Sequence, residues 1–292
     1  LFWVISGFVF AHAYLNRPTS PWRFAVARVA RLYPLHLLTL LMVAGLQAAS
    51  LAVAGHWQIY GNNDLHHFVL QLFFASNSVN VSHGLSFNGP IWSVSLEILV
   101  YAAFFLALWP LRKGGLWAAG AIAALCWGAY LAPITPPVIS KMVLLCAGYF
   151  FLGTLVYGTY GGWMRLPWVL ALSLAGVVAG AWFEIRGLVE PAAATGLVAL
   201  LALSGERLEA LGQRLTPLGD LSYSLYLIHV PLQIALLLVA DLALGGTRSF
   251  AETAWLLPVF LAVSMGFAHL TYHRFERPAG RWVKAALLPR RA

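Results

Sequence analysis

The chain has 292 residues, of which 61% are hydrophobic and only 10% are charged. Its mean hydropathy is +0.78, whereas a soluble domain carries about 25% charged residues. This composition excludes an ordinary soluble protein and predicts an all-α, polytopic bundle of transmembrane helices, with residues 1–292 forming one domain. The net charge of +8 does not indicate a nucleic-acid partner, because the positions of the basic residues are typical of membrane topology.

Membrane spans need about 20 mostly apolar residues. Nine stretches meet this condition in whole or in part: residues 1–15, 33–55, 90–110, 116–132, 139–159, 167–184, 191–204, 220–241 and 254–273. The apolar stretch Leu65–Ala75 is too short to span and is typical of an interfacial or re-entrant helix. Because the sequence opens at Leu1 inside an apolar segment, we expect that one upstream span is missing and that the full-length bundle has ten.

The basic residues test this division into spans, since cytoplasmic loops carry an excess of Lys and Arg. Nine spans place Lys141, Arg186 and Arg248 on one side of the membrane. The other fifteen basic residues fall on the opposite side: Arg17, Arg23, Arg28, Arg31, Arg112, Lys113, Arg165, Arg207, Arg214, Arg274, Arg277, Arg281, Lys284, Arg290 and Arg291. The asymmetry predicts that the C-terminal tail is cytoplasmic.

Glu97 is the only acidic side chain in the interior of a long apolar stretch. It lies within Ile91–Pro110, which contains no Lys, Arg or Asp. An ionisable side chain in a membrane is costly, about 2.5–3.5 kcal/mol for Asp on an insertion scale, so it normally faces the protein interior and has a partner. A structural ion pair or a protonated carboxyl is one interpretation, and a functional site is the one that we favour.

The helix that carries Glu97 has a polar stripe. Ser93, Glu97 and Tyr101 follow one another at intervals of four residues and therefore share a face. Trp92 is predicted near the outer interface of the membrane, where aromatic anchors are common. The stripe is predicted to descend from the outer surface into the bundle.

The eighth predicted span contains a second stripe, formed by Ser222, Tyr226, His229 and Gln233. These side chains fall within about 60° of one another on a helix. Pro231 predicts a kink near His229 and a freed backbone carbonyl. The histidine can act as a base, a ligand or a hydrogen-bond donor, although a histidine satisfied by a neighbouring helix remains the structural alternative.

Two clusters of polar residues lie where the predicted spans meet the cytoplasm. Arg28 and Arg31 are three residues apart, and their guanidinium groups suit the phosphates of an anionic donor or lipid, with topology as the alternative role. His269, His273 and Glu276 have a spacing that can bind a metal, but the neighbouring arginines would repel a cation. We therefore predict no metal site.

The loop at residues 56–89 is the longest predicted extracytoplasmic feature and contains no Lys or Arg. Its Asn, Ser, Gly and His side chains suit a neutral polar acceptor such as a sugar. A solvated loop that caps the bundle is the alternative.

Five elements of the chain together resemble the acyltransferase-3 family of integral membrane acyltransferases. They occur in the family's order: FWVISGF at 2–8, RVARLYP at 28–34, GPIWSVSLEILVY at 89–101, LSYSLYLIHVPL at 221–232 and FERP at 275–278. The resemblance implies a ten-span fold that moves an acyl group, often acetyl, from a cytoplasmic donor such as acyl-coenzyme A. No bound cofactor is expected, since acyl-coenzyme A is a co-substrate.

The resemblance also implies partners and roles. The acceptor would be a hydroxyl of an envelope glycan, a lipid-linked sugar or a small molecule, in a protein of the bacterial inner membrane surrounded by lipid. Arg28 and Arg31 match the donor-associated element, and the Trp-Ser-x-x-x-Glu element falls on Trp92, Ser93 and Glu97.

The family's proposed catalytic histidine lies on the first span, which we expect to be missing here. In the mechanism that follows, that histidine would deprotonate the acceptor and Glu97 would orient or stabilise it. His229 and Tyr226 would line the acyl passage or polarise the thioester, and Ser222 and Tyr101 would support the pocket.

A proton-coupled secondary transporter of a small polar solute is the main alternative, because intramembrane Glu and His also suit proton coupling. The sequence shows neither the inverted repeats nor the paired broken helices that are typical of transporters. A non-catalytic membrane scaffold is a third interpretation.

Overall fold

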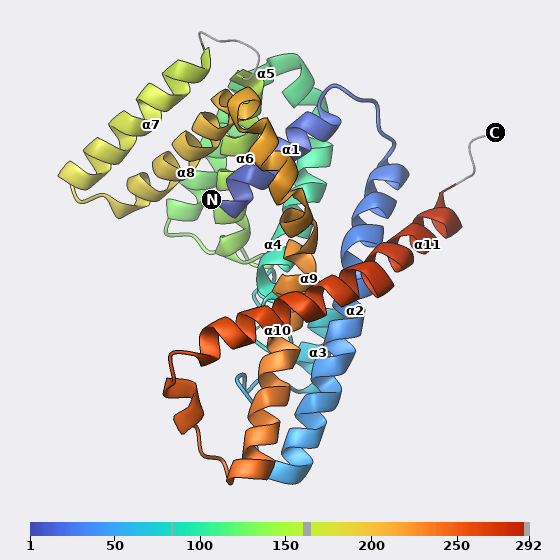
Figure 1. Cartoon of the computed structure of the whole chain (residues 1–292). Coiled ribbons are helices and arrows are strands. Elements are labelled where there is room, and N and C mark those ends of the chain that lie inside the picture. Colours follow the sequence, from blue (N-terminus) through green and yellow to red (C-terminus); the bar gives the residue numbers. More distant parts are fainter. Residues whose placement is uncertain (83, 160–164, 289–292) are drawn as a thin grey trace. The chain divides into compact units, whose positions relative to one another are not determined.

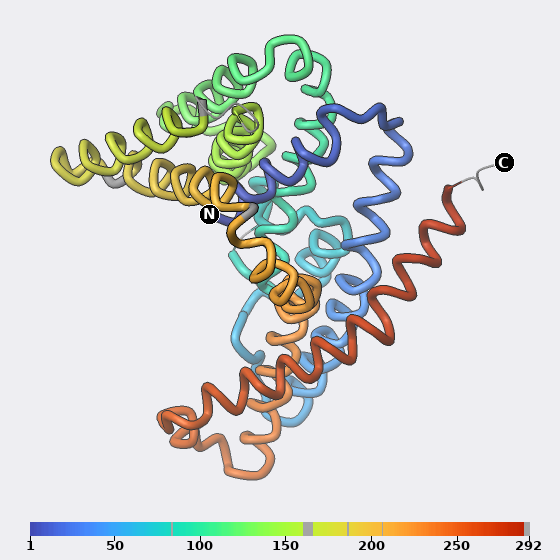
Figure 2. The backbone as a smooth tube through the Cα atoms, turned by 45° about the horizontal axis from the view of Figure 1, so that its top comes forward, coloured from blue at the N-terminus to red at the C-terminus, as the bar shows by residue number. Residues whose placement is uncertain are grey.

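The structure is a computed structural model that describes residues 1–82, 84–159 and 165–288, apart from the side chains at positions 165, 186 and 206 (Figures 1 and 2). These residues form helices and no strand, which confirms the all-α prediction. The α-helices are α1 (Phe2–Tyr14), α2 (Pro21–Ala54), α3 (Leu65–Leu72), α4 (Ile91–Leu106), α5 (Leu108–Leu131), α6 (Lys141–Thr159), α7 (Arg165–Trp182), α8 (Arg186–Leu203), α9 (Gly205–Leu244), α10 (Leu256–Thr271) and α11 (Arg277–Leu287). A short 3-10 helix, η1 (Ser249–Glu252), and a π-helical segment, η2 (Tyr272–Glu276), precede and follow α10.

The chain divides into two compact units. The first unit comprises Leu1–Thr19 and Leu96–Gln213, and the second comprises Ser20–Ser95 and Arg214–Ala292. The divisions fall between α1 and α2, inside α4 and inside α9. Ser93 therefore belongs to the second unit, whereas Glu97 belongs to the first.

Within the residues that the structure describes, five helical segments are long and apolar enough to cross a membrane: Pro21–Ala54, Leu108–Leu131, Lys141–Thr159, Arg207–Leu244 and Leu256–Leu287. Four shorter helices are also apolar: Phe2–Tyr14, Ile91–Leu106, Leu166–Trp182 and Gly187–Leu203. Every predicted span thus overlaps an apolar helix, while nine as the number of spans stays a prediction. The side chains of Arg165 and Arg186, and residues Arg290 and Arg291, lie outside the described part of the chain.

Helix α2 begins well before the predicted span at residue 33. The Ser20 hydroxyl accepts a hydrogen bond from the Arg23 amide at 3.3 Å, and Pro21 occupies the first turn. This pair is a typical start signal, since Ser favours the N-cap and Pro the first helical position. With 34 residues, α2 is about 51 Å long, against about 30 Å for a bilayer's hydrocarbon core. Arg28 and Arg31 therefore lie on a helix rather than in a loop.

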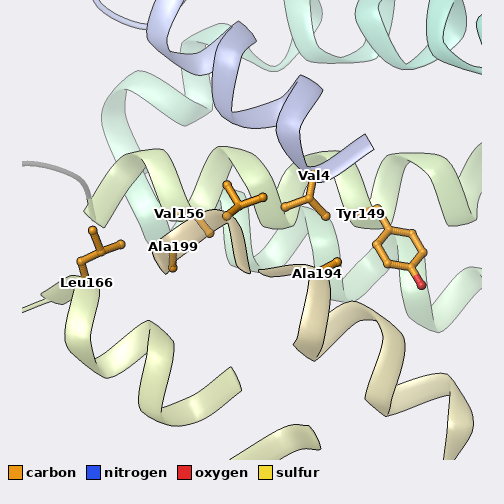
Figure 3. Packing of buried hydrophobic residues seen from close by; sticks show 7 residues of the cluster. Val4, Tyr149, Val156, Leu166, Ala194 and Ala199 are labelled. Carbon is orange, nitrogen blue, oxygen red and sulfur yellow. The ribbon is translucent and has the colours of Figure 1, made fainter. Parts of the chain in front are cut away.

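In the first unit, α1 packs closely against α6. A Cβ atom on Gly7 would lie 1.8 Å from the Phe150 carbonyl oxygen, and one on Gly153 would lie 1.9 Å from the Val4 carbonyl oxygen. Such small residues let two backbones approach where lipid provides no hydrophobic drive for helix association. Figure 3 shows the adjoining core, in which Val4 lies beside Val156 of α6 and near Ala194 and Ala199 of α8.

Alanine at Gly7 or Gly153 is expected to destabilise the protein by about 1–3 kcal/mol, because a backbone carbonyl occupies the position of the new methyl group. The matched control is Gly128→Ala in α5, where, beyond the adjoining residues and the backbone of its own helix, no atom of the described residues lies within 4 Å of the position that the methyl group would take. That change is expected to be neutral or to stabilise by up to about 1 kcal/mol, since Ala favours helix. Thermal unfolding in detergent measures all three, and equal effects would contradict the close packing.

The stretch predicted as an interfacial or re-entrant helix contains α3. The Asp64 carboxylate caps this helix by accepting the His67 amide at 2.9 Å, and it also lies 2.8 Å from the His67 ring. These hydrogen bonds, the backbone one first, hold the pKa of Asp64 below its usual range. The ring Nε2 of buried His36 lies 2.8 Å from the carbonyl oxygen of Gln71. The loop is therefore anchored on α2.

In the second unit, α10, η2 and α11 follow one another without a loop, and α11 packs on α2 (Figure 2). Pro34 has no amide hydrogen for the carbonyl of Ala30, four residues earlier. A Cβ on Gly280 would lie 2.6 Å from that Ala30 oxygen. Gly280 thus allows α11 to approach α2 beside the interrupted hydrogen-bond ladder.

Candidate functional site

Glu97 is buried in the first unit, with 4% of its surface exposed. Tyr101, one turn later on α4, donates its hydroxyl hydrogen to Glu97 Oε2. The other oxygen, Oε1, is buried and has no hydrogen-bond partner among the residues that the structure describes. Because buried polar atoms are normally paired, Oε1 is an acceptor available to a further donor.

Aromatic rings surround the Glu97–Tyr101 pair. The Tyr101 ring stacks on Phe10 of α1 with centroids 4.1 Å apart, and it lies 6.0 Å from Phe150 of α6. Phe104, Phe150 and Phe10 also contact one another edge to face. These rings keep the carboxyl in a largely apolar environment, in which a charge or hydrogen-bond partner has a larger effect than in water.

The second unit contains a different buried carboxyl group. Glu276, 3% exposed, forms an ion pair with Arg31 through Oε1 and accepts a hydrogen bond from Ser224 Oγ at 2.5 Å through Oε2. The Arg31 guanidinium also lies 5.6 Å from the centroid of the Tyr223 ring, whose hydroxyl donates to the Leu32 carbonyl at 2.7 Å. Arg31 is therefore held in one orientation from several sides.

The guanidinium of Arg31 is only partly enclosed by these contacts. Its side chain is 41% exposed, and the ion pair with Glu276 uses Nη1. A guanidinium has five N–H donors in a planar fork, so Arg31 retains donors for a second anion. Arg28, one turn earlier on α2, is half-buried.

The polar stripe predicted on α9 is only partly formed in the structure. The Tyr226 hydroxyl donates to the Pro90 carbonyl at 2.6 Å and lies 2.8 Å from Ser93 Oγ. The His229 ring lies 6.2 Å from that of Tyr226, and its Nδ1 lies 3.2 Å from the Leu225 carbonyl. Ser222, in contrast, is exposed and bonds the Gly219 carbonyl at 2.7 Å. Trp92 is half-buried at the start of α4.

Pro231 frees a carbonyl on α9, as its position predicts. The amide of a residue four positions after Leu227 would normally bond the Leu227 oxygen, and proline has none. Asn88 Nδ2 takes its place, donating to Leu227 O at 3.1 Å and to Thr39 Oγ1 at 2.9 Å. One buried amide thus connects the start of α4 to α2 and α9.

Asn88→Ala is expected to lower stability by about 1–3 kcal/mol, because it leaves the Leu227 carbonyl unsatisfied. In a Pro231→Ala background the cost should be smaller by about 1 kcal/mol, since the new amide can bond the same carbonyl. Thermal unfolding of the four proteins forms a double-mutant cycle. Strict additivity of the two substitutions would contradict this role of Asn88.

Sequence reasoning missed the partners of Glu276. The His269, His273 and Glu276 spacing assumes a regular α-helix, but Tyr272–Glu276 is π-helical, and Glu276 bonds Arg31 and Ser224 instead. No group of three metal-binding side chains occurs within the described residues. The FERP element at 275–278 was the available signal, since it places an acidic residue two positions before Pro278, which lies in the first turn of α11.

Apolar helices with buried polar side chains define a helical membrane protein. A family model described as an acyltransferase domain matches residues 1–273, and the chain belongs to the acyltransferase 3 family. It is thus an integral membrane protein of an acyltransferase family. Comparison with curated proteins and with solved structures gives no match.

Proposed function

We propose that the protein is a membrane O-acyltransferase, which moves an acyl group, most simply acetyl, from acyl-coenzyme A to a hydroxyl group. Membership of the acyltransferase 3 family supports acyl transfer. The observation that carries the proposal is the Glu97 carboxyl, buried in an apolar helix with one oxygen held by Tyr101 and the other available to a donor.

In this reaction the acceptor oxygen attacks the thioester carbonyl carbon, and the carbon–sulfur bond breaks. The hydroxyl proton passes through a general base to the departing coenzyme A thiolate. The proposed role of Glu97 is to accept a hydrogen bond from the protonated base at Oε1, as a carboxylate does in catalytic triads. The proposed role of His229 is to polarise the thioester carbonyl by hydrogen bonding.

Arg28 and Arg31 are proposed to bind the phosphates of the donor. Arginine suits this task because its planar fork binds phosphate through two parallel hydrogen bonds. Arg31 is held by Glu276 and Tyr223 while 41% of its side chain stays exposed. Such prior orientation reduces the entropy lost on binding.

The acceptor is proposed to be a hydroxyl of an envelope glycan, a lipid-linked sugar or a small molecule, in the bacterial inner membrane. The charge asymmetry of the sequence supports a cytoplasmic C-terminus, with Arg28 and Arg31 on the same side as the donor. The supporting residues are proposed to be Tyr101 in the first unit and Trp92, Ser93, Ser222 and Tyr226 in the second, although Ser222 is exposed in the structure.

The direct test uses membranes that contain the chain, incubated with acetyl-coenzyme A labelled in the acetyl group. We expect label to pass to a hydroxyl-bearing acceptor, with release of one coenzyme A thiol for each ester formed. Membranes without the protein provide the control. Proton-coupled solute uptake by reconstituted vesicles, without donor consumption, would favour a transporter instead.

A further inference from the structure

The first unit contains a cavity of about 1030 Å³, which the proposed acyl transfer does not use. Its lining comes from Leu15 and Asn16, which directly follow α1, and from α5, α6 and α7, and it includes Lys113, Trp117, Tyr157 and Trp168. This volume is slightly above the range of about 300–1,000 Å³ that is typical of small-molecule sites. The cavity is therefore large enough for a ligand of substantial size.

A break in α5 shapes one wall of the cavity. Gly115 has φ 53° and ψ −131°, a conformation outside the helical region, and beyond the adjoining backbone no described atom lies within 4 Å of the position that a Cβ would take. Glycine adopts positive φ readily. The chain changes direction there, and Lys113 before the break and Trp117 after it both line the cavity.

One part of the lining is cationic. Arg112 donates to the carbonyl oxygens of Leu15 at 2.8 Å, Tyr14 at 3.1 Å and Arg17 at 2.9 Å. These bonds hold its charge at the C-terminal end of α1. Lys113, the second cation, is exposed and lies 4.6 Å from the centroid of the Trp109 ring. Among the described residues that line the cavity, none is acidic.

The remaining part of the lining is apolar and open. Trp117 is 82% exposed, Trp168 is 68% exposed, and Leu172 is 71% exposed. All three belong to helices with an apolar composition. A ligand that satisfies both parts of this lining needs an anionic group and a long apolar group in one molecule.

We propose that this cavity binds an anionic phospholipid. The phosphate would lie beside Lys113 and Arg112, and an acyl chain would cover Trp117, Trp168 and Leu172. The charge asymmetry predicts that Arg112 and Lys113 lie on the cytoplasmic side, where the membrane leaflet is anionic and basic pockets between helices bind lipid head groups. This site is independent of the acyl-transfer proposal.

The test uses native mass spectrometry of the purified full chain in detergent, titrated with phosphatidylglycerol or with phosphatidylcholine of the same chains. We expect preferential retention of phosphatidylglycerol. Lys113→Gln should weaken its binding about fivefold, the equivalent of about 1 kcal/mol per basic residue near an anionic head group. The matched control is Lys284→Gln, which removes the same charge from an exposed position on α11.

A second variant tests the apolar part. Trp168→Ala should weaken binding of both lipids, because it removes a surface for the chain and leaves the cations in place. Equal retention of the two lipids by the wild type, or equal effects of Lys113→Gln and Lys284→Gln, would overturn the proposal. Displacement of phosphatidylglycerol from the Lys113-dependent site by acetyl-coenzyme A would also overturn it, because the cavity would then belong to the donor.

Discussion

Glu97→Gln is expected to lower the rate of acyl transfer by about 10²–10⁴-fold, the usual contribution of assisted general-base catalysis. The amide oxygen can still accept the Tyr101 hydroxyl, so the contact that positions the side chain remains. The substitution removes the negative charge that would stabilise a protonated base. Initial rates at saturating donor and acceptor measure the effect, with membrane expression and thermal midpoint as checks on folding.

The matched control for this substitution is Glu190→Gln in α8. Glu190 also lies near a tyrosine hydroxyl, that of Tyr149 at 3.5 Å, but it is exposed. It should retain the wild-type rate. A wild-type rate for Glu97→Gln, in protein that folds normally, would remove Glu97 from the proposed mechanism and leave it a structural role.

Arg31→Gln is expected to raise the KM for the acyl donor by about 10–100-fold, which corresponds to one or two lost charge-assisted hydrogen bonds. It should also reduce stability by about 1–3 kcal/mol, because Glu276 is left buried without its ion-pair partner. Donor-dependent initial rates and thermal unfolding measure the two effects separately.

The double variant Arg31→Gln, Glu276→Gln distinguishes these roles. Removing both charges should restore most of the lost stability, since no unpaired charge stays buried. It should not restore donor affinity. Arg23→Gln, an exposed arginine on the same helix, provides a control with little expected effect. Recovery of donor affinity in the double variant would show that Arg31 acts only as the partner of Glu276.

Much of the helical architecture was predictable from composition alone. Long apolar stretches must form helices in a membrane, because lipid offers no hydrogen bonds to the backbone. The boundaries were less accurate where a helix continues beyond its apolar part. Polar first turns extend α2 to Pro21 and α9 to Gly205, and hydropathy does not detect them. For α2, the N-cap residue Ser20 and the following Pro21 indicate the start of the helix in the sequence, but hydropathy alone does not take such residues into account.

The position of Glu97 was predictable because a charged group inside an apolar stretch is conspicuous in any sequence. Its neighbour Tyr101 was predictable as well, since both lie on one helix and the spacing of four residues fixes their relation. The prediction of a polar stripe on α9 was only partly right. Spacing placed Ser222 with Tyr226, yet Ser222 bonds its own helix.

The sequence by itself determined that this protein is helical, that it suits a membrane, and which side chains share a face of one helix. Only the tertiary structure decided which groups on different helices meet: Arg31 with Glu276, Asn88 with the carbonyl freed by Pro231, and Tyr101 with Phe10. Helical periodicity is a local property of the backbone, whereas these pairs depend on close packing between distant segments. For Glu97 the same distinction holds, because its burial was predictable, whereas the lack of a hydrogen-bond partner for Oε1 among the described residues was not.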